Sequence, residues 1–293
     1  MKIGKHYFTA GSEENFTSYL IEDSAELQPG KKRPAVVVCP GGGYLFLSDR
    51  EAEPIAMQFL SRGWQAFVLN YHCGSEDGRD QAVLKTDLVQ LATTIRSIRE
   101  HADEWNVAPD KIVLIGFSAG GHLVASMSGQ WYRDWLTTEA GVTADQLRFA
   151  AAVLAYPVID VEIIDRLMDE RGPSWDGMRT FVGQMNTAMS GENHPYGHGD
   201  CFYAAQKNVS RMTPPTFICH AADDGLIYVR NSLAYASALE EAQVPFEMHI
   251  FERGGHGFSL ANAYSSNEEG QMNAFNAHWV EAAFDWLTYH VQY

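Results

Sequence analysis

The segment at residues 111–121, KIVLIGFSAGG, decides the fold of this chain. Its aliphatic run, residues 112–115, is typical of a parallel strand that is buried on both faces of a sheet. The small residues after Ser118 favour a helix that begins at once, which leaves no room for an ordinary loop. We therefore predict Ser118 at the apex of a tight strand-to-helix turn, with its hydroxyl exposed at the carboxyl edge of the sheet.

Two glycines give this turn its pattern. Gly116 and Gly120 stand two residues before and two residues after Ser118. A Cβ atom at either position would obstruct the neighbouring backbone in so tight a turn. A GxSxG pattern alone arises by chance in many sequences. Here a strand precedes it and a small, apolar helix start follows it, so the segment predicts a nucleophile elbow.

The size and charge of the chain narrow the class of protein. A chain of 293 residues with 46% hydrophobic content can form one large domain with a substantial core. Its net charge of −16 repels phosphate backbones and anionic membrane surfaces, so we expect no nucleic acid and no membrane as partner. No segment approaches the ~20 apolar residues that cross a bilayer, and the N-terminus lacks a signal-peptide pattern. We expect a soluble, cytoplasmic protein.

Short apolar runs alternate with helical patterns along the chain. The predicted strands are residues 34–39, 65–70, 112–115, 150–156, 216–220 and 246–251, and the predicted helices, besides the one after Ser118, are residues 54–62, 82–101, 231–242 and 273–291. Parallel strands need helical connections, which cover both faces of the sheet. The alternation predicts an α/β fold with a mostly parallel sheet, and we expect residues 1–293 to form a single domain.

Residues 161–212 interrupt this alternation. The interval is rich in glycine, aromatic residues and methionine, and it shows no continuous strand or long amphipathic helix. Long insertions in compact domains are often lids or binding loops. We therefore expect a cap over the site, with a peripheral decoration or a subunit contact as the alternative.

Candidate partners for the serine follow two other strands. A serine hydroxyl needs a base within hydrogen-bond reach and a third group that orients the base. Asp223 and Asp224 follow residues 216–220, and His256 follows residues 246–251. The carboxyl ends of parallel strands collect catalytic groups at one edge of the sheet. Glycines around His256 single it out among 11 histidines, because they allow close backbone approach. Either aspartate can orient it, and we expect the other to cap the turn or the following helix.

A glycine run follows the first predicted strand. The tetrahedral intermediate of acyl transfer carries a negative oxygen, which needs backbone N–H donors aimed at it. We expect the amides of Gly42 and Gly43 to point into the site, and the amide of Ala119 to complete an oxyanion hole at the helix start. The alternative, a phosphate-binding loop, lacks the lysine and serine or threonine of a P-loop and the GxGxxG spacing.

Together these motifs resemble the α/β-hydrolase superfamily. Within it, the chain is similar to the esterase/lipase branch of hormone-sensitive-lipase-like enzymes and bacterial acetyl-xylan or sugar-ester esterases. The resemblance covers residues 19–289 and is carried by four stretches: CPGGGY with the following SDREAEP, GFSAGGH, HAADD with the later NS, and FERGGHGF. It implies that Ser118 is the nucleophile, His256 the general base and Asp224 the acid. Such enzymes commonly place the acid four residues after a strand-end histidine, here His220.

Two positions depart from that family pattern. Pro40 stands where many relatives have the histidine of HGGG, which leaves the oxyanion glycines intact. Tyr228 stands where many have a proline after the acid, which leaves Asp223 and Asp224 as alternatives. The resemblance implies a serine carboxylic-ester hydrolase that works through an acyl-enzyme without a cofactor or metal. The predicted partner is a small-molecule ester, with a short acyl group such as acetyl on a carbohydrate or small alcohol. We expect a monomer or a homodimer.

Aromatic side chains are the candidate substrate contacts. Flat aromatic faces suit sugar rings, and most ligand pockets are lined by such residues. On this basis Tyr44, Tyr156 and Trp175 are predicted to bind substrate. Ordinary packing in the core or the cap is the alternative interpretation, because aromatic rings dominate protein cores.

Three other functions fit parts of the sequence. The same triad serves peptidases of the prolyl-oligopeptidase type, but those carry a propeller or another large domain for which we see no room. A non-catalytic module of the same fold is disfavoured by the complete set of serine, aspartate and histidine. His194, His198 and Asp200 are metal-ligand types, but their glycine-rich loop gives no helical or strand spacing to hold a geometry.

Overall fold

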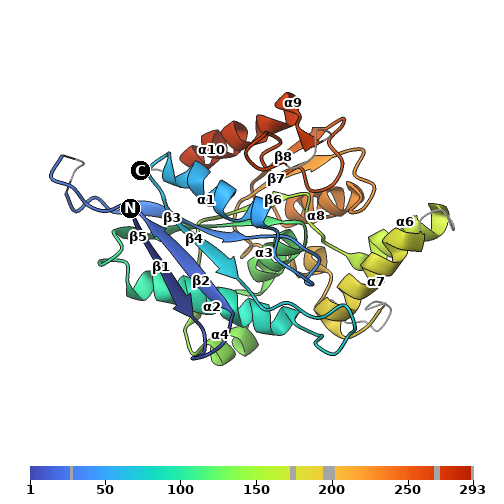
Figure 1. Cartoon of the computed structure of the whole chain (residues 1–293), viewed down its shortest axis with the longest axis horizontal. Helices are drawn as coiled ribbons and strands as arrows, with labels where there is room; N and C mark the ends of the chain where they lie inside the picture. The colour runs from blue at the N-terminus through green and yellow to red at the C-terminus, as the bar shows by residue number, and fades with distance from the viewer. Residues whose placement is uncertain (27–28, 172–175, 194–201, 267–270, 292–293) are drawn as a thin grey trace.

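The computed structural model describes residues 1–26, 29–171, 176–193, 202–266 and 271–291. Within these ranges the centre of the molecule is an eight-stranded sheet with the order β1-β2-β4-β3-β5-β6-β7-β8 (Figure 1). The strands are β1 (Lys2–Tyr7), β2 (Asn15–Leu20), β3 (Arg33–Cys39), β4 (Gln65–Asn70), β5 (Val107–Phe117), β6 (Ala151–Ala155), β7 (Thr216–Ala221) and β8 (Phe246–Phe251).

The strands from β3 to β8 are parallel to one another, and β2 pairs antiparallel with both β1 and β4. The predicted α/β class and mostly parallel sheet are therefore confirmed. Strands β1 and β2 were not predicted. The β1 strand lies at the sheet edge with mostly exposed side chains, so it lacks the apolar run by which the other strands are recognised.

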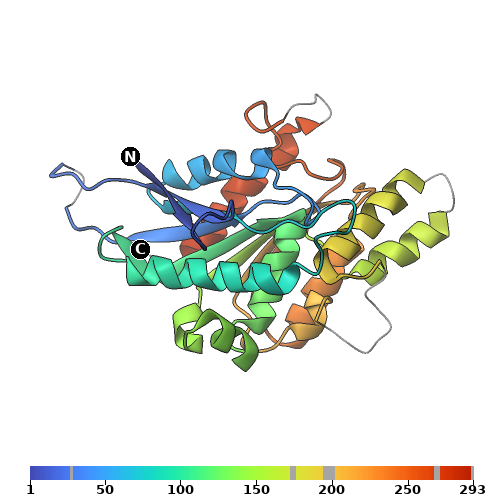
Figure 2. The same ribbon diagram turned by 60° about the horizontal axis from the view of Figure 1, so that its bottom comes forward.

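Helices cover both faces of the sheet, as Figures 1 and 2 show. Helices α1 and α10 pack on one face, and α2, α3 and α8 pack on the other. None of the helices among the described residues is both long and apolar enough to span a bilayer. The helices are α1 (Glu53–Leu60), α2 (Leu84–Glu100), α3 (Ser118–Gln130), α4 (Asp134–Ala140), α5 (Ala144–Leu147), α6 (Val161–Arg171), α7 (Asp176–Ser190), α8 (Arg230–Glu241), α9 (Ala274–Ala277) and α10 (Trp279–His290), with the 3₁₀ turns η1 (Asp49–Glu51) and η3 (Ala205–Asn208).

Strand β5 lies at the centre of the sheet and separates the two cores. Ile112 and Leu114 are fully buried on the α2 side, and Val113 and Ile115 are fully buried on the α10 side. Alternate side chains of a strand point to opposite faces, so an unbroken aliphatic run fits a strand with a core on each face. This packing holds the carboxyl end of β5, and with it Ser118, in a rigid position.

The prediction that residues 161–212 contain no long amphipathic helix is wrong. They form α6 and α7, which lie side by side at one end of the molecule in Figures 1 and 2. In α7, Val182, Met185 and Met189 are buried at helical spacing. Gly177 and Gly183 lower the helix propensity of this segment and obscured that pattern, so packing rather than propensity stabilises the helix.

The C-terminal helix also differs from its prediction over residues 273–291. It is divided into the short α9 and the longer α10. Asn273 caps α9, because its side chain accepts hydrogen bonds from the amides of Phe275 and Asn276.

Candidate active site

Ser118 occupies the predicted elbow between β5 and α3. Its φ of 50° lies in the left-handed region, which is strained for a residue with a side chain. A Cβ atom at Gly116 would lie 2.2 Å from the carbonyl oxygen of Gly120. A Cβ atom at Gly120 would lie 2.1 Å from the carbonyl oxygen of Cys39. The prediction that both positions must lack a Cβ is confirmed.

The structure brings the three predicted triad side chains together. Ser118 Oγ lies 2.9 Å from His256 Nε2, and His256 Nδ1 lies 2.7 Å from Asp224 Oδ2. A carboxylate beside Nδ1 fixes the proton on that nitrogen, because only a protonated nitrogen can donate to it. Nε2 then carries a lone pair and accepts from the serine hydroxyl. This is the tautomer in which an imidazole can act as a base toward Ser118.

Asp224 is the aspartate that contacts the imidazole, and it is almost fully buried. Its Oδ1 accepts hydrogen bonds from the amides of Leu226 and Ile227, at 3.0 and 2.9 Å. Burial alone would raise the pKa of this carboxyl, but the charge of His256 and the hydrogen bonds from two histidines outweigh burial and hold the pKa below its usual range. The group is therefore a carboxylate at neutral pH.

Asp223 has a different contact from the one we expected. Among the described residues, Asp223 has no hydrogen bond to the turn or to the following helix: Asp224 accepts the amides of the turn, and no side chain caps α8. Instead, Asp223 Oδ1 accepts a hydrogen bond from the amide of Gly255 at 2.8 Å. The two neighbouring aspartates thus hold the histidine loop at two points, one at its side chain and one at its backbone.

His220, on β7, is a second buried histidine that contacts the acid. Its Nε2 lies 3.1 Å from Asp224 Oδ2 and 2.7 Å from the carbonyl oxygen of Ile227. Two acceptors around Nε2 assign the proton to that nitrogen, so Nδ1 accepts from Ser232 Oγ at 2.7 Å. His220 therefore holds the carboxylate of Asp224 through a second contact, and the four-residue spacing is its only signal in the sequence.

The electrostatic surroundings of His256 favour its protonated form. Burial lowers the pKa of the imidazole, but the charge of Asp224, its hydrogen bond and the charge of Glu51 together raise the pKa above the usual value. The side chain is 18% exposed, so the imidazole lies at the floor of an open site.

The glycine loop after β3 lies directly beside the serine. Gly42 has a φ of 128° and Gly43 a φ of 66°, conformations that favour glycine. A Cβ atom at Gly42 would lie 1.9 Å from the carbonyl oxygen of Phe46, so the loop closes tightly on itself. Among the described residues, no acceptor is bonded to the amides of Gly42 and Gly43. The amide of Ala119 belongs to the first turn of α3, where helix geometry provides no acceptor either.

A cavity of about 230 Å³ opens over the serine. Phe181, from α7, closes one side, and a Cβ atom at Gly43 would lie 2.9 Å from its ring. The cavity is lined by Gly42, Gly43, Phe46, Ser48, Arg50, Glu51, Ser118, Phe181, Leu226, His256 and Gly257. The space is small and mixed in polarity, with apolar side chains from three separate segments.

Two of the predicted aromatic substrate contacts, Tyr44 and Tyr156, lie outside the cavity at Ser118. Tyr44 is fully buried, and its hydroxyl lies 2.8 Å from Nδ1 of the buried His122. Tyr156 is also fully buried, and its hydroxyl donates to Glu51 Oε1 at 2.7 Å. Neither side chain lines the cavity, because each ring points into the core behind the site. Trp175 lies outside the described residues.

The residues weighed as a metal site, His194, His198 and Asp200, also lie outside the described residues. Within the part of the chain that the structure describes, no three histidine, cysteine, aspartate or glutamate side chains are grouped so as to hold a metal ion.

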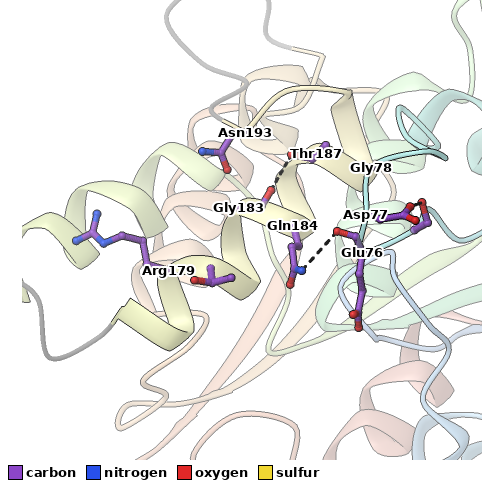
Figure 3. A pocket seen from close by; sticks show the side chains of 10 residues that line it. Glu76, Asp77, Gly78, Arg179, Gly183, Gln184, Thr187 and Asn193 are labelled. Carbon is purple, nitrogen blue, oxygen red and sulfur yellow. Dashed lines mark hydrogen bonds between the residues drawn. The ribbon is translucent and has the colours of Figure 1, made fainter.

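A second, larger cavity of about 550 Å³ lies between α7 and residues 75–78 (Figure 3). Gln184 Nε2 approaches the carbonyl oxygen of Glu76 at 3.5 Å across it, and Thr187 Oγ1 donates to the carbonyl oxygen of Gly183 at 2.9 Å. Polar side chains line most of this cavity, and no member of the triad reaches it. Helix α7 therefore contributes to both the cavity at the serine and this polar groove.

The sheet topology, the elbow and the triad define a class of protein. The chain is an α/β-hydrolase of the esterase/lipase type. Residues 25–239 match the profile of the BD-FAE family, and the chain belongs to that family.

The chain is also similar to proteins whose names state an activity. The chain is 31% identical over 250 residues to an endo-1,4-beta-xylanase B of Butyrivibrio fibrisolvens and 30% identical over 238 residues to an acetylxylan esterase of Xylanibacter ruminicola. These alignments cover 85% and 80% of this chain, which spans only 35% and 43% of the length of those relatives. The crystal structure of a carboxylesterase from Lactobacillus plantarum superimposes with a TM-score of 0.81 at 29% identity, covering 99% of this chain and 98% of that chain.

Proposed function

We propose that this chain hydrolyses carboxylic esters through an acyl-enzyme on Ser118. The observation that carries the proposal is the continuous path of hydrogen bonds from Ser118 Oγ to His256, at 2.9 Å, and on to Asp224, at 2.7 Å. A serine is activated when a neutral imidazole accepts its proton and a carboxylate stabilises the resulting imidazolium. The contacts of Asp224 with two histidines and two amides hold the carboxylate in place for this role.

The reaction proceeds in two halves. Ser118 Oγ attacks the ester carbonyl carbon while His256 Nε2 takes the hydroxyl proton, and the tetrahedral intermediate collapses when His256 returns that proton to the leaving alcohol. Water then attacks the acyl-enzyme by the same route and releases the acid. The amides of Gly42, Gly43 and Ala119 stabilise the oxyanion in both halves, because no acceptor from the described residues competes for the two loop amides.

The substrate that we propose is a short acyl ester, such as an acetyl ester of a carbohydrate or small alcohol. The cavity of about 230 Å³ is bounded by Phe46, Phe181 and Leu226, which leaves space for a small acyl group. The name of the acetylxylan esterase relative supports the carbohydrate part of this proposal.

We further propose that α6 and α7 act as the cap over the site. The support is Phe181, which extends from α7 to the oxyanion loop and forms a wall of the cavity. This assignment retains residues 161–212 as an insertion within one domain, now with a helical pair as its framework.

The decisive experiment combines labelling with a substrate series. A serine-reactive phosphonate should modify Ser118, and the variant Ser118→Ala should lose nearly all hydrolysis, by ~10⁴-fold or more. The wild type should prefer p-nitrophenyl acetate over the butyrate and octanoate esters, and should release acetate from acetylated xylo-oligosaccharides. A preference for octanoate would contradict the short acyl group, and inertness toward every ester would favour a non-catalytic module. Cleavage of peptide amides in place of esters would favour the peptidase.

A further inference from the structure

The 3₁₀ turn η1 places a buried carboxylate, Glu51, beside the candidate site. The residue is 2% exposed. Its Oε2 accepts a hydrogen bond from the amide of Gly41 at 2.8 Å, and its Oε1 accepts one from the hydroxyl of Tyr156 at 2.7 Å. A buried carboxylate is costly unless it is hydrogen-bonded, and here each oxygen is bonded to a different part of the site.

The first bond acts on the oxyanion loop. Gly41 is packed between the carboxylate and the elbow, since a Cβ atom there would lie 2.6 Å from Glu51 Oε2 and 2.9 Å from Ser118 Cβ. Gly41 directly precedes Gly42 and Gly43, whose amides are the proposed donors. The bond between Gly41 and Glu51 therefore fixes the backbone at the point where the oxyanion loop begins.

The second bond acts on the histidine loop. The hydroxyl of Tyr156 accepts a hydrogen bond from the amide of Ser259 at 2.9 Å. The Tyr156 ring packs edge-on against the His256 imidazole, with centroids 5.2 Å apart. The neighbour of the carboxylate in η1, Arg50, adds two contacts: its Nη1 donates to the carbonyl oxygen of Gly257 at 3.0 Å, and its own carbonyl oxygen accepts from Ser259 Oγ at 2.7 Å.

We propose that Glu51 is a positioning residue that holds the oxyanion loop and the histidine loop in register on either side of Ser118. The inference rests on the ester hydrolysis proposed above and adds a fourth side chain to its machinery. The charges around the imidazole agree with the geometry. Burial lowers the pKa of His256, while Asp224 and then Glu51 raise the pKa and Arg50 opposes them. The buried carboxylate thus favours the imidazolium that forms when the serine loses its proton.

The variant Glu51→Gln tests this role. Glutamine keeps the shape of the side chain but has one acceptor oxygen and no charge, so either Gly41 or Tyr156 loses its acceptor. We expect kcat per active site to fall about 10- to 100-fold, somewhat less than the ~10²- to 10³-fold loss from deleting an oxyanion donor itself. KM for p-nitrophenyl acetate should stay within about threefold. The acid limb of the pH–rate profile should move to lower pH, because one group that raises the pKa of His256 is gone.

Glu53→Gln is the matched control. Glu53 is an exposed carboxylate two residues further on, and it bonds the hydroxyl of Tyr19 away from the site. The same change of charge there should leave kcat, KM and the pH profile as in the wild type.

Tyr156→Phe provides an independent second variant. It keeps the ring against His256 but removes the hydroxyl that joins Glu51 to Ser259, so kcat per active site should again fall with KM little changed. Active sites are counted by phosphonate titration, which removes any unfolded fraction from the comparison. The inference is overturned if Glu51→Gln and Tyr156→Phe both keep the wild-type kcat per active site and the wild-type acid limb of the pH–rate profile. If Glu51→Gln does not fold, wild-type values of kcat and of the acid limb in Tyr156→Phe overturn the inference. Loss of the proposed function would look different, because the wild type would then fail to hydrolyse esters or Ser118→Ala would keep the activity.

Discussion

At the scale of single residues, the site concentrates unusual backbone conformations. Ser118, Tyr44, Tyr156 and Ser259 all have positive φ although none is glycine. Each such residue costs of order 1–3 kcal/mol and persists only where its surroundings enforce it. Here the enforcing contacts are the closed elbow, the Tyr44 bond to His122 and the Glu51 network, which all converge on the serine.

The raised pKa of His256 predicts the pH dependence of the reaction. The base must be neutral to accept the serine proton, so kcat/KM should fall as the pH drops through that pKa, with a midpoint above the usual histidine value of about 6.5. In Asp224→Asn the main group that raises the pKa is lost, so the midpoint should move to lower pH and kcat should fall by ~10³- to 10⁴-fold. Rates with p-nitrophenyl acetate between pH 5 and 9 measure both effects.

Asp223→Asn is the control for that prediction, because Asp223 contacts only the amide of Gly255 among the described residues. Its pH midpoint should stay close to that of the wild type. Equal shifts in the two variants would show that the charge of the pair, and not the contact with the imidazole, sets the pKa of His256.

Replacing a glycine by alanine is expected to have opposite effects on stability at two positions. In Gly120→Ala the new methyl group would lie 2.1 and 2.3 Å from the carbonyl oxygens of Cys39 and Pro40, so the elbow must distort and unfolding free energy should fall by about 3 kcal/mol. In Gly177→Ala, on α7, the methyl group meets nothing within 4 Å, and stability should rise by about 0.5–1 kcal/mol. Urea unfolding of both variants measures the difference, and a similar loss in both would contradict the packing argument.

At the scale of elements, α7 contributes side chains to two cavities. Phe181 bounds the cavity at the serine, and Gln184 and Thr187 line the polar groove of Figure 3. Val182 and Met185 are buried and fasten the helix to the core. If the cavity at Ser118 receives the acyl group, as proposed above, Phe181 limits the space for that group.

Phe181→Ala tests that role of α7. Removing the ring should lengthen the cavity, so the ratio of kcat/KM for the butyrate ester to that for the acetate ester should rise about 3- to 10-fold. The butyrate ester has two more CH₂ groups than the acetate ester. Burial of the first contributes ~0.8 kcal/mol to the binding of the transition state, and partial burial of the second adds to it. Gln184→Ala, which changes a side chain of the same helix that lines the polar groove and not the cavity at Ser118, should leave the ratio unchanged. An unchanged ratio in Phe181→Ala would show that α7 does not limit the acyl group.

At the scale of the whole molecule, the net charge of −16 dominates the surface. Like charges keep copies of a protein apart, and that repulsion vanishes where the net charge is zero. Turbidity of a concentrated solution should therefore peak near pH 5.0, the isoelectric point expected from the sequence, and should be absent at pH 8. Sedimentation at pH 8 would distinguish the monomer from the homodimer. A turbidity maximum far from pH 5 would indicate that patches, rather than net charge, control association.

The elements that the sequence predicted well are those with a local signature. Strand β5 carries an unbroken aliphatic run, and the elbow carries glycines whose required positions follow from the turn itself. The order of serine, aspartate and histidine followed from strand ends, because parallel strands place their carboxyl ends at one edge of the sheet. Helix α7 escaped prediction because glycine and threonine weaken its helical pattern, which packing then stabilises, whereas α6 contains neither residue and could have been predicted from its amphipathic sequence.

The sequence by itself determined the α/β class, the elbow at Ser118 and the candidacy of His256, because short-range sterics and strand burial leave few alternatives there. Only the tertiary structure decided that Asp224 and not Asp223 meets the imidazole, that Tyr44 and Tyr156 lie behind the site, and that Glu51 joins its two loops. The bond between Tyr156 and Glu51 connects residues 105 positions apart. Such a contact depends on how the sheet and its turns pack in three dimensions, and no local pattern of residue types encodes it.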